Sequence, residues 1–371
     1  MTQAPSRAPV LLAAGGTGGH LFPAEALAAA LAKRNVAVHL ATDSRATRYG
    51  GAFAEDNVHV VASATLRARN PIAVVRTVSA LGAGVLQAWA LIGRLRPQAV
   101  IGFGGYPTIP PVLAATARRV PSLIHDANAV IGRANRLLAP RVTAIATTFP
   151  NLFPNRPAWA AKATLTGNPV RPAVVAAAAT PYAPPRDPLR LLVFGGSQGA
   201  RIMAEIVPPA VRRLDAALRG RLAIVQQVRE EDLPRVRDAY AKLSIWAEVA
   251  TFFPDLPARM AASHLVVARS GASTVAELAA IGRPAILVPL PHALDQDQFA
   301  NAGVLEGAGG AIRIVQDMFT PQRLADEITA LAQAPQRLQT MAAAARSLGR
   351  LDAADRLAEL VLAVAAKGAN K

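Results

Sequence analysis

The stretch that decides the fold of this chain is VLLAAGGTGGH, residues 10–20. An apolar run enters a turn that contains four glycines, and His20 and an alanine-rich amphipathic segment follow the turn. A buried strand, a glycine turn and a helix in this order form the first unit of a parallel α/β sheet. Such a turn leaves backbone N–H groups at a helix N-terminus, where anions bind. We therefore predict a ligand-binding turn with His20 directly behind it.

The same pattern recurs along the 371 residues and divides them into two similar halves. The second half repeats it in LLVFGGSQGA, residues 191–200, and between the halves TGNPVRPAV (166–174) and ATPYAPPRDP (179–188) indicate a hinge and a linker. Apolar runs that alternate with helical patterns predict parallel sheets covered on both faces. The predicted strands lie within residues 8–14, 36–41, 58–62, 98–103, 121–125 and 142–147 of the first half and 189–194, 222–228, 246–252, 264–268, 284–290 and 311–315 of the second.

The predicted fold class is therefore α/β, with two Rossmann-like domains whose parallel sheets face each other across a cleft. This is the architecture of the GT-B glycosyltransferases. We expect the first domain over residues 1–168 and the second over 169–348. We predict a C-terminal helix over 349–371, which can pack back on the first domain.

The composition limits the partners of the chain. Lys and Arg number 40 against 24 Asp and Glu, a net charge of +16, which favours an anionic partner. The basic residues are scattered and aromatics are few, so we expect no nucleic acid. The chain has no cysteine, which excludes disulfides and thiolate metal sites, and no export signal opens it.

One segment raises the question of a membrane. IAVVRTVSALGAGVLQAWALI, residues 72–92, has nearly the length of a spanning helix, but polar residues interrupt it. Two interpretations remain: a buried or half-buried helix, or a patch at the surface of an acidic membrane. The helical face in question contains Val75, Val78, Gly82, Val85, Leu86 and Trp89, and the flanking cations are Arg67, Arg69, Arg94 and Arg96.

Several polar residues follow predicted strands of the first half. Two segments begin at a strand end: GFGGYPTIPPVLAA (102–115) and LIHDANAVIGRANRLL (123–138). In the glycine turn of residues 15–19, the third glycine of a dinucleotide fingerprint is missing, because Leu21 stands at its position. A nicotinamide or flavin enzyme is therefore disfavoured. Because ligands bind at the carboxyl ends of parallel strands, we expect one shared rim formed by Thr17, His20, Tyr106, His125, Asp126 and Asn128.

The richest stretch of the second half is residues 266–302. Ala272 is predicted to start a helix with an anion-binding N-terminus, and Glu277 lies in its second turn. Glu277 is either a ligand of ribose hydroxyls or a solvated helix charge. Asp295 and Asp297 spell a D-x-D metal motif, which we interpret as helix capping; no metal is expected.

Together, GGTGGHLFPA, GFGGYPTIPP, TGNPVR, GGSQGA and RSGASTVAELAAIGRPAILVPLP…DQDQFANA resemble the MurG family of peptidoglycan N-acetylglucosaminyltransferases, over about residues 9–350. The resemblance implies UDP-GlcNAc as donor, lipid I as acceptor and inversion at the anomeric carbon to give lipid II. It implies no cofactor, and a peripheral enzyme at the cytoplasmic face of the plasma membrane in contact with acidic lipids.

The resemblance also implies roles for individual residues. Ser197 and Arg171 would hold the diphosphate, the backbone of Phe253 would read uracil, and Gln298 would bind the transferred sugar. The full donor set is Thr17, Gly18, Gly19, Asn128, Arg171, Ser197, Phe253, Ala272, Ser273, Thr274, Val275, Ala276, Glu277 and Gln298. The acceptor set is Tyr106, His125 and Asn135, and the catalytic candidates are His20 and Asp126.

Some positions depart from the family pattern. His125-Asp126-Ala127-Asn128 replaces His-Glu-Gln-Asn, and Asp297 replaces a His or Gln. As general base we expect His20, because imidazole titrates near neutral pH, with Asp126 as the alternative base or as the group that orients a histidine. Three other functions share this fold or ligand: a UDP-sugar 2-epimerase, a non-catalytic nucleotide- or lipid-binding protein, and a transferase to another lipid such as diacylglycerol.

Overall fold

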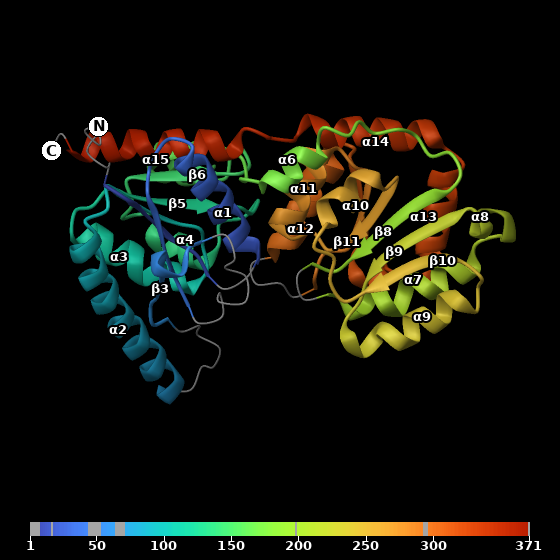
Figure 1. Cartoon of the computed structure of the whole chain (residues 1–371), viewed down its shortest axis with the longest axis horizontal. Helices are drawn as coiled ribbons and strands as arrows, with labels where there is room; N and C mark the ends of the chain where they lie inside the picture. Colours follow the sequence, from blue (N-terminus) through green and yellow to red (C-terminus); the bar gives the residue numbers. More distant parts are fainter. Residues whose placement is uncertain are drawn as a thin grey trace. The chain divides into compact units, whose positions relative to one another are not determined.

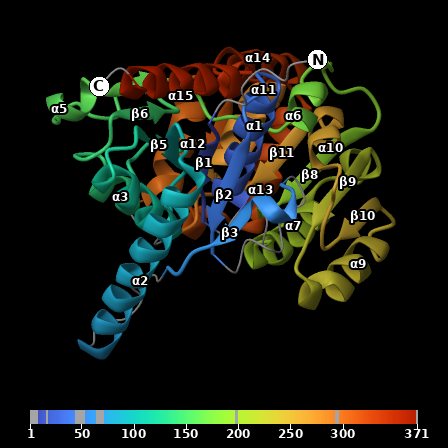
Figure 2. The same cartoon turned by 60° about the vertical axis from the view of Figure 1, so that its left-hand side comes forward.

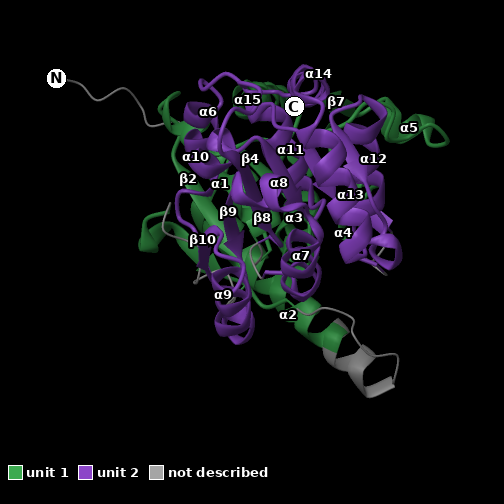
Figure 3. Cartoon of the chain, turned by 90° about the vertical axis from the view of Figure 1, so that its right-hand side faces the viewer, with its two compact units in different colours: residues 1–171, 352–371 green, residues 172–351 purple. Residues whose placement is uncertain are grey.

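The structure, a computed structural model, describes residues 8–15, 18–43, 53–63, 71–196, 199–291 and 296–369, without the side chains of 71–76, 78 and 369. The chain divides into two compact units, which Figure 3 distinguishes by colour. Unit 1 consists of residues Met1–Arg171 and Asp352–Lys371, and unit 2 of Pro172–Leu351. Figure 1 follows the elements along the chain.

Over the described residues, unit 1 holds a parallel sheet of seven strands in the order β3-β2-β1-β4-β5-β6-β7. The strands are β1 (Val10–Ala13), β2 (Val38–Thr42), β3 (Val58–Val60), β4 (Ala99–Gly102), β5 (Ser122–Asp126), β6 (Ala144–Thr147) and β7 (Ala163–Leu165). The helices are α1 (Gly18–Ala32), α2 (Pro71–Leu95), α3 (Ile109–Ala117), α4 (Arg133–Leu138), α5 (Pro157–Ala160) and α15 (Ala353–Ala369), with 3-10 turns η2 (Glu55–Asn57) and η3 (Tyr106–Thr108).

Helices cover both faces of this sheet. Because successive residues of a strand point to opposite faces, each strand contributes side chains to two cores. Val10 and Leu12 of β1 belong to a core shared with α1 and α15, whereas Leu11 belongs to a second core shared with α2, α3 and α4. The C-terminal helix α15 packs along α1, where Arg34 Nη1 lies 2.7 Å from Asp355 Oδ1. The last helix of the chain is therefore part of unit 1.

Unit 2 has a parallel sheet of six strands, counted over the described residues, in the order β10-β9-β8-β11-β12-β13. The strands are β8 (Leu189–Phe194), β9 (Leu222–Gln227), β10 (Trp246–Ala250), β11 (Leu265–Ala268), β12 (Ala285–Leu287) and β13 (Ala311–Arg313). The helices are α6 (Pro172–Ala177), α7 (Arg201–Arg213), α8 (Ala216–Gly220), α9 (Leu233–Ala241), α10 (Leu256–Ala262), α11 (Ala272–Ile281), α12 (Asp297–Gly307), α13 (Pro321–Ala332) and α14 (Pro335–Ser347), with 3-10 turns η4 (Glu230–Asp232) and η6 (Gln316–Met318).

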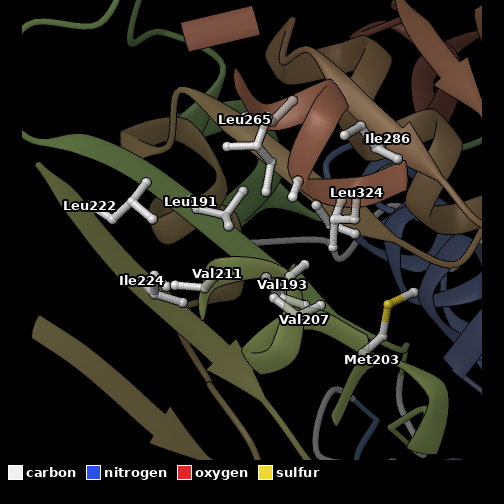
Figure 4. Close-up of a cluster of buried hydrophobic side chains, with 14 of the residues drawn as sticks. Leu191, Val193, Met203, Val207, Val211, Leu222, Ile224, Leu265, Ile286 and Leu324 are labelled. Carbon is white, nitrogen blue, oxygen red and sulfur yellow. The ribbon is translucent and has the colours of Figure 1, made fainter. Parts of the chain in front are cut away.

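The core of unit 2 lies between one face of its sheet and the helices α7, α9 and α13. Figure 4 shows Leu191 and Val193 of β8 beside Val207 and Val211 of α7. The proline-rich segment 179–188 also packs on this unit: the Tyr182 hydroxyl donates to the His264 carbonyl oxygen (3.1 Å).

Each of the twelve apolar runs predicted as strands contains a strand, and the two all-parallel sheets confirm the predicted α/β class. The prediction missed β7, which has three residues and lies partly exposed at the sheet edge, directly before the segment 166–174. So short an edge strand does not need the continuous apolar run of a central strand.

Helix α2 contains the segment that raised the membrane question, and it is half-buried. Ala88, Leu91 and Ile92 are buried in the core with α3 and α4, while Leu86 is 72% and Trp89 40% exposed. Figure 2 shows α2 extending outward from the other helices of unit 1. In the described part of the chain, no helix combines the length and apolarity that crossing a bilayer requires.

Candidate active site

Three neighbouring strands of unit 1 bring the predicted residues of the first half together. β1, β4 and β5 are adjacent in the sheet. His20 is the third residue of α1 after β1, Tyr106 begins η3 after β4, and His125 and Asp126 end β5. The carboxyl ends of neighbouring parallel strands meet at one sheet edge, which is where open α/β sheets bind ligands. Thr17 lies outside the described residues.

The imidazole of His20 lies against the glycine turn that follows β4. A Cβ atom on Gly104 would lie 3.2 Å from His20 Cδ2 and Nε2, and one on Gly105 would lie 3.3 Å from Cε1. Both glycines have positive φ, +96° and +75°, which residues with side chains rarely adopt. The two glycines therefore provide a bare backbone surface on which the ring of His20 packs.

His125 is a buried imidazole whose tautomer follows from its partner. Its Nε2 lies 3.1 Å from the Gly167 carbonyl oxygen, which can only accept, so Nε2 carries the proton and Nδ1 a lone pair. Burial lowers the pKa of His125 from 6.5 to about 4; the Gly167 hydrogen bond opposes this shift and nearby His20 adds to it. At neutral pH His125 is therefore uncharged.

Asp126 is 1% exposed, and its carboxylate organises the loop that follows β5. Oδ1 accepts from the backbone N–H of Asn128 (3.1 Å), and Oδ2 accepts from the backbone N–H of Gly132 (2.9 Å) and from Nδ2 of Asn135 (3.0 Å). The same Asn135 amide donates to the His125 carbonyl oxygen (2.9 Å). These hydrogen bonds to a charged acceptor tie the loop and the start of α4 to the end of β5.

Unit 1 also contains the candidates Gly18, Gly19, Tyr106 and Arg171. Gly18 and Gly19 are the first two residues of α1, and Tyr106 is partly buried against the core beneath α3. Arg171 ends the first of the two segments of unit 1, and its guanidinium carbon lies 4.0 Å from the centre of the Phe22 ring. Sequence analysis had not identified Phe22 as part of the site.

In unit 2, α11 begins at Ala272, as predicted, immediately after β11 and Arg269-Ser270-Gly271. Gly271 is the N-cap, and no described side chain caps this end of the helix. Glu277 is 5% exposed, so the interpretation as a solvated helix charge is wrong. Between Ala272 and Glu277, the first turns of α11 contain Ser273, Thr274, Val275 and Ala276.

A hydrogen-bond network joins the turn after β11 to the first turns of α12. Ser270 Oγ donates to the Gln298 carbonyl oxygen (2.8 Å), and Asn301 Nδ2 donates to the Ser270 carbonyl oxygen (3.3 Å). The Gln298 side-chain oxygen in turn accepts from the Leu290 N–H (3.0 Å). Asn301 is fully buried, so it holds α12 against β11.

Arg269, in the same turn, makes a separate set of hydrogen bonds. It is 8% exposed, and its Nη1 donates to the carbonyl oxygens of Val288 (3.1 Å) and Pro289 (3.0 Å), while Nη2 donates to Gln316 Oε1 (2.5 Å). Arg269 was not among the residues predicted for the site. An arginine between a strand end and a helix start was the available signal.

Of the two other predicted positions of unit 2, the structure describes one, Phe253. Phe253 is buried, and the Arg259 guanidinium carbon lies 4.3 Å from its ring centre. Arg259 is held by Glu248 (2.5 Å) and Asp255 (2.8 Å). Ser197 lies outside the described residues.

The D-x-D segment is partly described. Asp297 begins α12, and its Oδ1 accepts from the Gln298 N–H (2.8 Å), whereas Asp295 lies outside the described residues. Within the described ranges, no group of three or more His, Asp or Glu side chains is placed to hold a metal ion. Unit 1 therefore carries imidazoles beside a glycine turn, and unit 2 carries a helix N-terminus at Ala272. An imidazole suits transfer of a proton, and a helix N-terminus suits an anionic group.

Comparison with known proteins agrees with this arrangement. The N-terminal domain of glycosyltransferase family 28 matches residues 10–147 and its C-terminal domain matches residues 190–357. A protein of Rhodopseudomonas palustris strain HaA2, named UDP-N-acetylglucosamine--N-acetylmuramyl-(pentapeptide) pyrophosphoryl-undecaprenol N-acetylglucosamine transferase, is 66% identical over 358 residues, which are 96% of this chain and 98% of the relative.

Solved structures extend the comparison. The crystal structure of Acinetobacter baumannii MurG is similar with a TM-score of 0.77 and 29% identity, over 95% of this chain and 99% of that one. A UDP-GlcNAc 2-epimerase of Neisseria meningitidis, bound to UDP-GlcNAc, has a TM-score of 0.69 at 15% identity, over 96% of this chain and 100% of that one, which shows a shared fold alone. The two domain matches and the relatives that align over nearly their full length lead to one conclusion: the chain belongs to glycosyltransferase family 28 and, within it, to the MurG family.

Proposed function

We propose that this enzyme transfers N-acetylglucosamine from UDP-GlcNAc to the muramoyl 4-hydroxyl of lipid I, which forms lipid II for peptidoglycan synthesis. The observation that carries the proposal is the 66% identity, over nearly both full lengths, to a relative whose name states this donor and acceptor. Groups of the kind that such a transfer needs support the proposal: the imidazole of His20 in unit 1 and the N-terminus of α11 in unit 2.

In the proposed reaction His20 is the general base. As the acceptor oxygen forms its bond to the anomeric carbon, His20 takes the proton of that hydroxyl and becomes an imidazolium, and UDP leaves with the electron pair of the broken bond. Attack from the face opposite UDP inverts the anomeric carbon. The packing of the His20 ring on Gly104 and Gly105 supports this assignment, because it holds the ring at the strand-end rim.

His125 and Asp126 are support residues in this proposal. Neutral His125 places no second positive charge beside His20 when His20 takes the proton. The Asp126 carboxylate already accepts from Asn128, Gly132 and Asn135, so its role is to order the loop after β5 and the start of α4, which carries acceptor-binding Asn135.

The leaving group needs positive charge rather than a metal or cofactor in this proposal. The amide end of α11 offers partial positive charge to the diphosphate, and Arg171 adds a permanent cation. Glu277 binds the ribose hydroxyls, Gln298 binds the transferred sugar, and the backbone at Phe253 reads uracil. Ser197, together with Thr17, Gly18, Gly19 and Asn128, completes the donor contacts.

For membrane attachment we propose that unit 1 lies on acidic lipids at the cytoplasmic face of the plasma membrane. Unit 1 has 21 Lys and Arg against 8 Asp and Glu, a net charge of +13, while unit 2 has 19 against 16, a net charge of +3. Leu86 and Trp89 of α2 and Leu137 of α4 are exposed on the same unit. Apolar side chains and excess positive charge are the two contributions that bind a protein to an anionic surface.

The test is transfer from UDP-[14C]GlcNAc to lipid I, to diacylglycerol, and with no acceptor, using the full chain and anionic vesicles. We expect labelled lipid II from lipid I alone. Label on diacylglycerol in preference to lipid I would overturn the acceptor assignment. Formation of UDP-ManNAc without any acceptor would instead identify an epimerase.

A further inference from the structure

The side chain of Arg171 rests on an aromatic ring that the proposed mechanism does not use. Its guanidinium carbon lies 4.0 Å from the centre of the Phe22 ring, and both residues belong to unit 1. Phe22 is half-buried in the first turns of α1, two residues after His20. One contact therefore connects the start of α1 to Arg171, where the first segment of unit 1 ends.

Gly18 makes this position of the ring possible. A Cβ atom on residue 18 would lie 3.0 Å from Phe22 Cε2 and 3.1 Å from Cζ, closer than real Cβ contacts normally come. The ring of Phe22 thus lies back over the first residue of its own helix. The glycine of the turn serves packing here, in addition to any contact it makes with a ligand.

Stacking and anion binding use different parts of a guanidinium group. The cation–π contact engages the flat face, whereas the N–H donors point outward in the plane and remain oriented for the oxygens of a phosphate. A stacked arginine also loses less side-chain freedom when an anion binds, since the ring already restricts it. Glu25 lies one turn further along α1; burial raises its pKa, and the charge of Arg171 opposes that shift.

We propose that Phe22 is a positioning residue for Arg171 and holds its guanidinium flat, with the edge turned to the diphosphate of the sugar nucleotide. The inference rests on the proposed function, in which Arg171 binds that diphosphate. Phe22 touches no reacting atom in this scheme; it acts through Arg171.

The experiment compares Phe22→Leu, Phe22→Trp, Arg171→Ala and the double variant Phe22→Leu/Arg171→Ala. Loss of the aromatic face is expected to raise the KM for UDP-GlcNAc and the inhibition constant of UDP by about 2- to 30-fold, the range of one cation–π contact. The KM for lipid I should stay within about 2-fold, and Phe22→Trp, which restores an aromatic face, should restore the donor KM. In the Arg171→Ala background, Phe22→Leu should have no further effect.

A matched control is Trp159→Leu, which removes the Arg156 stacking partner (4.8 Å) elsewhere in unit 1 and should leave the donor KM unchanged. Additive effects of Phe22→Leu and Arg171→Ala would overturn the proposal, as would an unchanged donor KM in a folded Phe22→Leu variant. Equal rises in both KM values would also overturn it, because they indicate a general disturbance of α1. If the unmodified enzyme neither binds UDP nor turns over, it is the proposed function that fails.

Discussion

Replacement of Asp126 by asparagine separates a structural role from a catalytic one. The carboxylate accepts three hydrogen bonds at 2.9–3.1 Å, and an amide of the same shape offers only one accepting oxygen. If that oxygen faces Gly132 and Asn135, the new NH2 group opposes the N–H of Asn128. One bond to a charged acceptor is lost, worth about 1.5–3 kcal/mol, and the two that remain become weaker neutral bonds.

We therefore expect Asp126→Asn to lower the stability of unit 1 by about 2–3 kcal/mol, because part of the lost hydrogen bonding is offset by the removal of a buried charge. For a unit of this size that corresponds to a fall in Tm of about 5–10 °C. Below the transition the variant should retain measurable kcat, because His20 is unchanged.

Thermal unfolding followed by circular dichroism, together with initial rates at saturating UDP-GlcNAc and lipid I, measures both quantities. Asp352→Asn is the matched control, since it removes only a surface pair with Arg356 (2.6 Å) and should shift Tm by less than about 2 °C. An Asp126→Asn variant with unchanged Tm and a kcat reduced by about a thousandfold or more would refute the reasoning and make Asp126 the base.

Four further predictions follow from the same geometry. His20→Gln should lower kcat by about 10²–10⁴-fold with the donor KM little changed, in steady-state assays; near-normal kcat would exclude His20 as base. Gly105→Ala should cost about 1–3 kcal/mol, because φ 75° and ψ 160° suit glycine and the new methyl group meets His20, so both Tm and kcat should fall. Burial, with Arg190 and Arg283, lowers the pKa of His264 to about 4, so its contribution to stability is complete above pH 6.5 and is lost as pH falls toward 4. The free energy of unfolding of His264→Gln, measured in urea, should therefore depend less on pH over that window than that of the unmodified protein. An unchanged pH dependence would contradict this. Replacing Leu86 and Trp89 by serine should weaken co-sedimentation with anionic vesicles without lowering Tm, and unchanged binding would remove α2 from the proposed membrane surface.

Much of the fold was predictable because it depends on local patterns. Twelve apolar runs marked twelve strands, and the glycine after β11 marked the start of α11 at Ala272. A central parallel strand is buried on both faces, so its sequence alone carries a strong signal. The strand β7 carried none, since three partly exposed residues at an edge need no apolar run.

The sequence by itself also determined which residue types were available at the strand ends: His20 behind a glycine turn, and His125-Asp126 at the end of a buried run. What those residues do depends on neighbours far away in the chain. The protonated nitrogen of His125 follows from the carbonyl of Gly167, 42 residues on, and the burial of Glu277 follows from packing around α11. The stacking of Arg171 on Phe22 and the contact of His20 with Gly104 likewise join distant segments. Strand and turn signals are local because they reflect backbone geometry, whereas burial, tautomer and stacking arise only when the sheet brings remote strand ends together.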